Sequence, residues 1–235
     1  MTTNGWAAPQ RPNNYAEETL VRAILDGTFA PGTALPGERT LAAQLGVTRP
    51  TLREAIQRLA RDGWLTVQHG KQTLVRNYWQ DGGLNVLSTL VQHSSQLPPA
   101  FVTNLLDVRL QLAPAYTQAA VSQHPTTIAS RLANHADLPD EPPAFAAFDW
   151  QLHRQLTILS GNPIYTLILN GFADFYEQIA QLYFMLPTAR AASRGFYAAL
   201  QPLAAAGDAA AAETLTRQVM QRSIALWQQT QQEAA

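Results

Sequence analysis

Two arginines at four-residue spacing are the side chains of this 235-residue sequence that most clearly indicate a binding site, in this case for an anion. Arg49 and Arg53 share one face of a predicted helix with Gln57, behind a Thr48 N-cap and with Pro50 in the first turn. Because a helix N-terminus carries partial positive charge, arginines there are favourable when an anion binds beside them. DNA phosphates are the anion that this pattern favours. The alternative is that both arginines are solvated side chains of an ordinary amphipathic helix.

The surrounding pattern predicts a helix-turn-helix that positions these arginines. A short helix begins at Glu38, and the turn at Gly46-Val47 is so short that it must fold one helix across the next. Gly63 marks the end of the second helix. The buried stripe of this helix follows the spacing i, i+3, i+4, i+7, i+8: Leu52, Ala55, Ile56, Leu59 and Ala60.

A small hairpin is predicted directly after the second helix. Residues 64–67 and 73–75 are β-prone runs, and Gly70 supplies the positive φ that a tight turn needs. Lys71, the only lysine in the chain, lies at the tip. Beside His69 and Gly70 it is placed to contact a phosphate or the minor groove, although it could also be a solubilising residue.

Composition limits the remaining possibilities. Hydrophobic residues make up 46% of the chain, enough for two globular cores, and the absence of cysteine excludes disulfides, thiolate metal sites and a cysteine nucleophile. No long apolar run or signal pattern is present, so we expect a soluble, cytoplasmic protein that does not bind membranes. Residues 1–78 have nine Lys/Arg and six Asp/Glu, whereas residues 79–235 have seven and eleven. Only the first segment suits a polyanion.

The rest of the chain reads as helices, and the predicted fold is mainly α. We expect a winged helix-turn-helix domain at 1–76, a linker at 77–83 and an all-α bundle of seven helices at 84–235. The seven predicted helices are 84–92, 100–123, 126–136, 144–159, 163–184, 188–206 and 208–232.

Residues 46–71, GVTRPTLREAIQRLARDGWLTVQHGK, resemble the winged helix of the GntR family of bacterial regulators. The resemblance continues through GLNVLSTL at Gly83, SGNPIYTLILNG at Ser160 and the region of Trp227, so it covers nearly the whole chain. It is similar to the fatty-acid branch of the family, which implies a DNA-binding homodimer that long-chain acyl-CoA releases from its operator. Such a regulator represses fatty-acid degradation genes and activates unsaturated fatty-acid synthesis genes. It uses no cofactor besides this effector ligand.

The resemblance also implies which residues form the sites. Contacts to phosphates and base edges would come from Arg39, Thr48, Arg49, Thr51 and Arg53, with His69, Gly70 and Lys71 at the minor groove. The acyl-CoA site would contain Leu105, Leu106, Arg109, Tyr183 and Trp227. Three positions of the last helix depart from the family pattern: Met220, Arg222 and Gln232 stand where Gly, Glu and Lys are expected. Loss of the lysine could weaken contacts to the CoA phosphates unless Arg217 or Arg222 compensates.

Many GntR relatives instead bind a small carboxylate through a metal held by one carboxylate and three histidines. Asp107, Asp149 and His153 resemble part of that set. The other two histidines should lie near Tyr197 and near Val219 or Met220, where none is present, and two ligands of four hold a divalent ion poorly. We therefore expect no metal, and His153 as a buried, hydrogen-bonded histidine.

A third alternative is a helical enzyme or acyl-CoA carrier with a vestigial DNA-binding module. The sequence contains no nucleophile elbow, paired-carboxylate motif or phosphate-binding loop, so we expect no catalytic residues.

Overall fold

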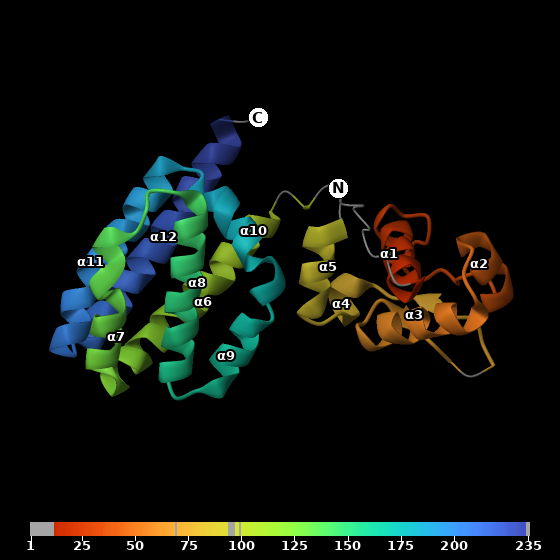
Figure 1. Cartoon of the computed structure of the whole chain (residues 1–235), viewed down its shortest axis with the longest axis horizontal. Helices are drawn as coiled ribbons and strands as arrows, with labels where there is room; N and C mark the ends of the chain where they lie inside the picture. The colour runs from red at the N-terminus through yellow and green to blue at the C-terminus, as the bar shows by residue number, and fades with distance from the viewer. Residues whose placement is uncertain (1–11, 69, 94–96, 99, 234–235) are drawn as a thin grey trace, which may run out of the picture. The chain divides into compact units, whose positions relative to one another are not determined.

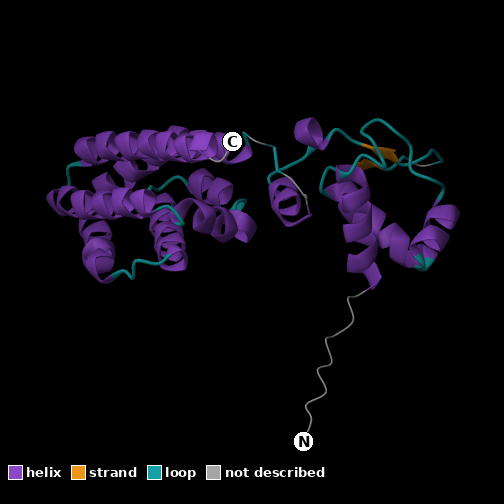
Figure 2. Ribbon diagram, turned by 90° about the horizontal axis from the view of Figure 1, so that it is seen from above, coloured by secondary structure: helices purple, strands orange, loops and turns teal. Residues whose placement is uncertain are grey.

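A computed structural model describes the backbone of residues 12–68, 70–93, 97–98 and 100–233, and side chains from residue 14 to residue 231 with the same gaps. The chain divides into two compact units between Leu97 and Pro98. Helices predominate, and one short two-stranded sheet is present in the part that the structure describes (Figure 2). The predicted mainly-α fold is therefore confirmed.

The first unit contains the predicted helix-turn-helix. It consists of α1 (Pro12–Leu25), α2 (Glu38–Leu45), α3 (Arg49–Arg61), β1 (Leu65–Thr66) and β2 (Leu74–Val75), followed by α4 (Tyr78–Asp81) and α5 (Asn85–His93). Helix α3 packs against both α1 and α2. Its buried residues are Leu52, Ala55, Ile56 and Leu59, four members of the predicted stripe.

Local chemistry fixes the turn between α2 and α3. Gly46 ends α2 in the left-handed conformation, at φ 67°, which costs a glycine no side-chain strain. Thr48 then caps α3 by accepting a hydrogen bond from the backbone N–H of Thr51. Pro50 lies in the first turn, where the missing N–H leaves no hydrogen bond unmade.

The wing is an antiparallel pair in which Leu65 faces Val75 and Thr66 faces Leu74. A third segment extends this pair: Ala34 bridges to Leu74, and the N–H of Leu35 donates to the carbonyl of Thr73 at 2.8 Å. The expected extended connection before α2 therefore forms an edge of the wing.

The predicted linker at 77–83 contains helix α4. Gly82, which follows this helix, is tightly packed against Gly63. A Cβ added to Gly63 would lie 2.8 Å from the Cα of Gly82, so the end of α3 and the end of α4 are in direct backbone contact. Helix α5, predicted as the first helix of the all-α bundle at 84–235, packs against α1 of the first unit. The first compact unit thus extends to Leu97, beyond the expected boundary.

The second unit is an antiparallel helical bundle (Figure 1). Its elements are α6 (Phe101–Gln123), α7 (Pro125–Leu132), the 3-10 helix η1 (Ala133–Asp137), α8 (Pro142–Leu159), α9 (Pro163–Asn170), α10 (Ala173–Phe184), α11 (Pro187–Ala206) and α12 (Ala209–Glu233). Helices α6 and α12 pack along each other, as do α7 and α11, and α8 and α10. Fully buried side chains such as Phe145, Tyr197 and Leu156 form the core.

Two predicted helices of this unit differ from the structure. The single helix expected at 163–184 is wrong, because the chain breaks at Gly171 into α9 and α10. There the N–H of Phe172 bonds to the carbonyl of Leu169, three residues back, and the weak helix former Gly171 allows this tighter turn. The helix expected at 126–136 ends at Leu132 and continues as η1.

Among the helices that the structure describes, none combines the length and apolar character needed to cross a membrane.

Candidate DNA-binding surface and effector cavity

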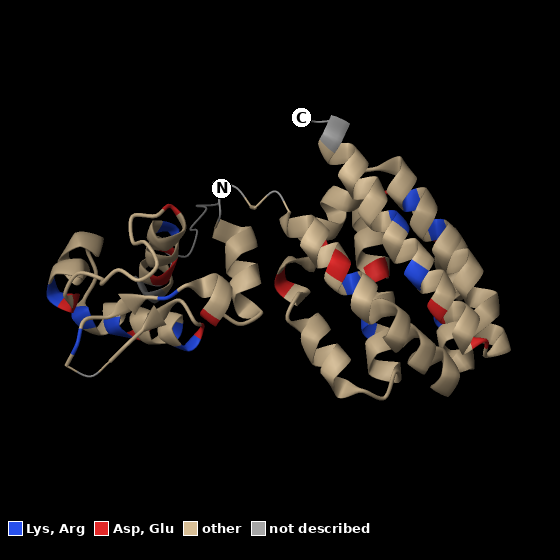
Figure 3. Cartoon of the chain, turned by 180° about the vertical axis from the view of Figure 1, so that it is seen from behind, with Lys and Arg blue, Asp and Glu red and all other residues tan. Residues whose placement is uncertain are grey.

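Helix α3 presents a basic, solvent-exposed face. Several arginine positions follow one another along this helix (Figure 3). Arg49, Arg53, Gln57 and Arg58, together with Pro50 and Glu54, line an open depression on it. The four-residue spacing of Arg49, Arg53 and Gln57 therefore places these side chains on one outer surface, as expected.

Arg53 is held by a carboxylate of the preceding helix. Its Nη2 donates to Oε2 of Glu38 at 2.6 Å, and its Nε donates to Oε1 at 3.3 Å. The hydrogen bonds from Arg53 lower the pKa of Glu38 below its usual value, and the charge of Arg49 acts in the same direction. Glu38 is therefore ionised at neutral pH, and the Arg53 guanidinium is oriented before any ligand binds. The sequence pattern did not indicate this pair.

Thr48 and Thr51 form the N-terminal end of the same face. Their hydroxyl groups lie 2.9 Å apart and share a hydrogen bond. Thr48 is exposed and Thr51 is half-buried, so the pair is fixed by the cap while remaining at the surface.

The remaining predicted DNA contacts are on the surface or outside the described residues. Arg39, Gly70 and Lys71 are exposed, and Gly70 has φ 71°, as the tight turn requires. The N–H of Lys71 closes the turn on the carbonyl of Gln68 at 3.2 Å. His69 lies outside the part that the structure describes.

The helical unit contains an apolar cavity of about 100 Å³. Four of the five predicted ligand residues, Leu105, Leu106, Arg109 and Tyr183, line it. Trp227 does not; it is half-buried against the core, and its indole N–H has no hydrogen-bond partner among the described residues. The other lining residues come from four helices and are Val102, Val108, Leu112, Tyr116, His153, Tyr165, Ile168, Leu169, Phe172, Phe175, Tyr176, Ile179, Ala180 and Phe184.

A buried carboxylate, Asp149 on α8, organises the polar side of this cavity. It accepts hydrogen bonds from Nη2 of Arg109 at 2.5 Å, from the hydroxyl of Tyr176 at 2.5 Å and from the hydroxyl of Tyr197 at 2.9 Å. Burial raises the pKa of both tyrosines, which remain protonated donors. Burial is the largest influence on the pKa of Asp149 and acts to raise it. The charge of Arg109, the neighbouring His153 and the hydrogen bonds from Tyr176 and Tyr197 together outweigh burial, so the pKa is lowered and the carboxyl stays ionised.

His153 lies one turn after Asp149 and is buried and hydrogen-bonded, as predicted. Its Nδ1 lies 2.7 Å from the hydroxyl of Tyr116, and its Nε2 lies 3.6 Å from Oδ1 of Asp149. Burial lowers the pKa of His153 to about 3, and the nearby charge of Arg109 adds to this effect. The imidazole is therefore neutral across the physiological range.

The three residues that resemble part of the family's metal-binding set, Asp107, Asp149 and His153, do not form a metal site in the described structure. Asp107 is exposed on α6, whereas the carboxylate of Asp149 is occupied by Arg109 and two tyrosines. Within the described ranges, no group of three His, Cys, Asp or Glu side chains has the geometry to hold a metal. The sequence pattern did not indicate that Tyr116 contacts His153, or that Tyr176 and Tyr197 donate to Asp149. The four-residue step from Asp149 to His153 indicated one polar helix face, but the partners come from α6, α10 and α11.

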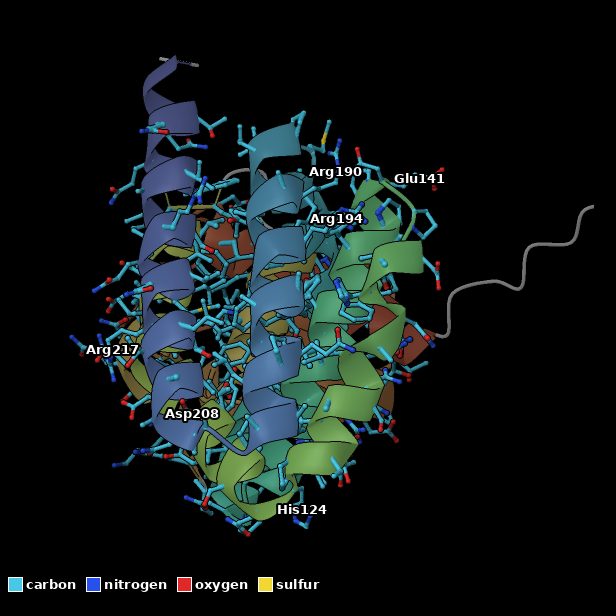
Figure 4. The ribbon with its side chains drawn as sticks, turned by 90° about the vertical axis from the view of Figure 1, so that its left-hand side faces the viewer. His124, Glu141, Arg190, Arg194, Asp208 and Arg217 are labelled. Atoms are coloured by element: carbon cyan, nitrogen blue, oxygen red, sulfur yellow. The ribbon has the colours of Figure 1, made fainter. Side chains whose placement is uncertain are left out.

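Two arginines of α11 stabilise the loops around the C-terminal end of α10, which forms one wall of the cavity. Arg190 on α11 donates to the carbonyl of Phe184 at 2.6 Å and pairs with Asp140 at 2.9 Å. Arg194, one turn later, donates to the carbonyl of Leu138. Both arginines point toward the loop that carries Glu141 (Figure 4).

The departures from the family pattern lie on α12. Met220 is buried in the core, and Arg222 is exposed. Arg217 is also at the surface, where it pairs with Glu213 at 2.9 Å (Figure 4). The side chain of Gln232 lies outside the described residues.

A winged helix-turn-helix joined to an all-helical unit with an internal cavity defines a two-domain transcriptional regulator. Residues 13–75 match the family model "Bacterial regulatory proteins, gntR family", and residues 76–235 match the "FadR C-terminal domain". The chain therefore belongs to the GntR family of bacterial regulatory proteins, with a FadR-type C-terminal domain, and is a DNA-binding regulator rather than an enzyme.

Individual relatives agree with this assignment. The chain is 46% identical over 198 residues to the fatty acid metabolism regulator protein of Escherichia coli O1:K1, across 84% of this chain and 83% of that protein. The same values hold for the protein of that name from Shigella boydii serotype 18. Among solved structures, Lar, which controls expression of the Listeria monocytogenes agr system, matches with a TM-score of 0.56 at 15% identity. The match covers 95% of this chain and 98% of that chain. This last match shows the fold alone.

Proposed function

We propose that this chain is a fatty-acid-responsive regulator that binds operator DNA as a homodimer in the cytoplasm and is released by long-chain acyl-CoA. In this role it represses fatty-acid degradation genes and activates unsaturated fatty-acid synthesis genes. The observation that carries the proposal is the apolar cavity within the FadR-type domain, lined by Leu105, Leu106, Arg109 and Tyr183. The name of the 46% identical relatives supports the link to fatty acids.

The lining of the cavity suits an acyl chain. Most of its side chains are aliphatic or aromatic, and each methylene that enters an apolar site contributes about 0.8 kcal/mol. A sixteen-carbon chain therefore gains far more than a four-carbon chain from the same walls. Arg109, the cation among the described lining residues, is already paired with Asp149, so a neutral acyl group can lie beside it without leaving a buried charge unpaired.

The size of the cavity gives a reason for the response. About 100 Å³ is well below the roughly 300–1,000 Å³ of typical ligand sites. A long chain would therefore have to displace lining helices such as α10. An effector shifts DNA binding only through its different affinities for the free and DNA-bound states, and such a displacement supplies that difference.

The CoA moiety and the dimer complete the proposal. The anionic phosphates would lie in solvent near exposed cations of α12, where Arg217 and Arg222 could replace the expected lysine. One winged helix covers little DNA, so two copies on a pseudo-palindromic site would supply the affinity that specific recognition needs.

Calorimetric titration of the full-length protein with palmitoyl-CoA, butyryl-CoA and CoA tests the ligand assignment. We expect saturable heat with palmitoyl-CoA only. Ile179→Trp, which places a larger side chain at the cavity wall, should weaken binding at least about tenfold, as expected when several methylenes lose their contacts. The matched control Ile158→Trp, at an exposed site outside the cavity, should bind normally. Equal binding of CoA and palmitoyl-CoA would show that the cavity does not hold the acyl chain.

A further inference from the structure

Glu38 is not among the predicted DNA contacts, but it forms an ion pair with Arg53, which is. We propose that Glu38 is a positioning residue for sequence recognition: it holds Arg53 so that one defined edge of the guanidinium faces a guanine. The inference rests on the proposed DNA-binding role of α3, and it concerns how that role achieves specificity. Glu38 is the first residue of α2 and lies 15 residues before Arg53, so the tertiary packing of two helices creates the pair.

Donor geometry shows which edge remains available. A guanidinium has five N–H groups in a fixed planar fork. Glu38 uses the side formed by Nε and Nη2, with donor–acceptor distances of 3.3 and 2.6 Å. The opposite N–H of Nη2 and both N–H groups of Nη1 remain for another partner. Two parallel donors at that end match the O6 and N7 acceptors that guanine presents in the major groove.

The exposure of Arg53 and Glu38 shows why a fixed orientation of Arg53 would favour the guanine contact. Arg53 is 59% exposed, and a free arginine at that exposure would sample many rotamers, whereas Glu38 is 32% exposed and fixed at the start of a helix. Restricting Arg53 before binding lowers the entropy lost when the guanine contact forms.

The negative charge of Glu38 should also increase specificity. A carboxylate beside Arg53 and near Arg49 reduces the positive potential that any DNA backbone would feel. Non-specific affinity is therefore lowered, while the guanine contact is favoured by the fixed geometry. The expected result is a larger ratio of specific to non-specific affinity.

Glu38→Gln tests this directly, because it removes the charge and the two-point contact but preserves size. The probe is the duplex that wild-type protein selects from a random-sequence pool, and affinity is measured by fluorescence anisotropy. Arg53→Ala identifies the relevant guanine as the one whose replacement no longer matters. At that position the wild type should lose about tenfold on G→A replacement, and Glu38→Gln less than about threefold. Affinity for an unselected duplex should stay equal or rise.

Two controls separate positioning from general effects. Asp62→Asn removes a similar pair, between Asp62 and Arg61 at the other end of α3, and should leave guanine discrimination unchanged. In an Arg53→Ala background, Glu38→Gln should have no further effect on discrimination, because Glu38 acts through Arg53.

Three outcomes would overturn the inference. Equal gain of affinity for all duplexes would mean that Glu38 only repels DNA or masks Arg53. Equal loss for all, with a lower melting temperature, would mean that the pair only stabilises the fold. Unchanged discrimination would mean that Arg53 reads the guanine unaided. If the wild type selects no sequence at all, the proposed DNA-binding role itself fails, which is a distinct result.

Discussion

Arg109 and Asp149 form an ion pair at the wall of the effector cavity, with Nη2 of the arginine 2.5 Å from Oδ2 of the aspartate. The Asp149 side chain is 2% exposed and that of Arg109 is 19% exposed. Since a buried charge without a partner is strongly unfavourable, each residue depends on the other to be tolerated in this place. The pair therefore links the stability of the bundle to the site that we propose for the ligand.

Asp149→Ala should destabilise the protein markedly. The substitution leaves the Arg109 guanidinium without its counter-charge and removes the acceptor for the hydroxyls of Tyr176 and Tyr197. Loss of one partner of a buried pair typically costs about 3–5 kcal/mol. Urea unfolding of the full-length protein, followed by circular dichroism, measures this change.

The double variant Arg109→Met/Asp149→Leu is the informative control for that experiment. It removes both charges and fills the space with apolar atoms, so it should unfold closer to the wild type than Asp149→Ala does. If the two variants are equally unstable, shape rather than charge determines the cost.

Stability should fall in mild acid because of His153. Its pKa is about 3 in the folded protein and about 6.5 in the unfolded chain, so the unfolded state binds the extra proton between these values. The contribution of His153 to the free energy of unfolding should therefore decrease by up to about 1.4 kcal/mol per pH unit as pH falls from 6.5 toward 3. His153→Phe should show a shallower decrease between pH 7 and pH 5. Parallel curves for the two proteins would contradict the buried neutral histidine.

Metal should not bind tightly. Among the residues that the structure describes, Asp149 is the carboxylate that lies close to His153, and the positively charged guanidinium of Arg109 already occupies it. We expect far less than one zinc or nickel ion per chain by elemental analysis of protein purified without chelators. A stoichiometric ion would instead support a regulator that binds a small carboxylate through a metal.

Substitutions on the DNA-binding surface should separate base reading from phosphate binding. Arg49→Ala and Arg53→Ala should each cost about 1–3 kcal/mol on the selected operator if they reach guanine. Lys71→Ala should weaken binding to all sequences evenly and reduce the salt dependence by about one counterion. Arg61→Ala, at the far end of α3 and paired with Asp62, is the matched control and should change little. Unaltered operator affinity in Arg53→Ala would show that α3 is not the recognition helix.

The first unit was predictable because its signals are local. Thr48, Pro50 and Gly46 specify caps and turns within a few residues, and the apolar stripe of α3 gives its buried face. The pairing of Glu38 with Arg53 was not predictable, since it joins residues on two helices whose crossing geometry the sequence does not state.

The effector cavity was predictable only in part, and chiefly through family resemblance. Leu105, Leu106, Arg109 and Tyr183 do line it, whereas Trp227 packs outside it. The network around Asp149 joins four helices, and helical periodicity describes each helix separately without indicating which faces meet. The break at Gly171 was not predicted, because the apolar pattern continues on both sides of this single weak helix former.

The most direct test of the central claim is operator binding by full-length protein in the presence of acyl-CoA. Fluorescence anisotropy with the selected duplex at fixed salt gives the dissociation constant at increasing palmitoyl-CoA, with butyryl-CoA and free CoA as controls. We expect palmitoyl-CoA to weaken operator binding at least about tenfold, a coupling within the usual range, and the controls to have little effect. Operator affinity that is unchanged by palmitoyl-CoA at tens of micromolar, or lowered equally by free CoA, would contradict the acyl-CoA response.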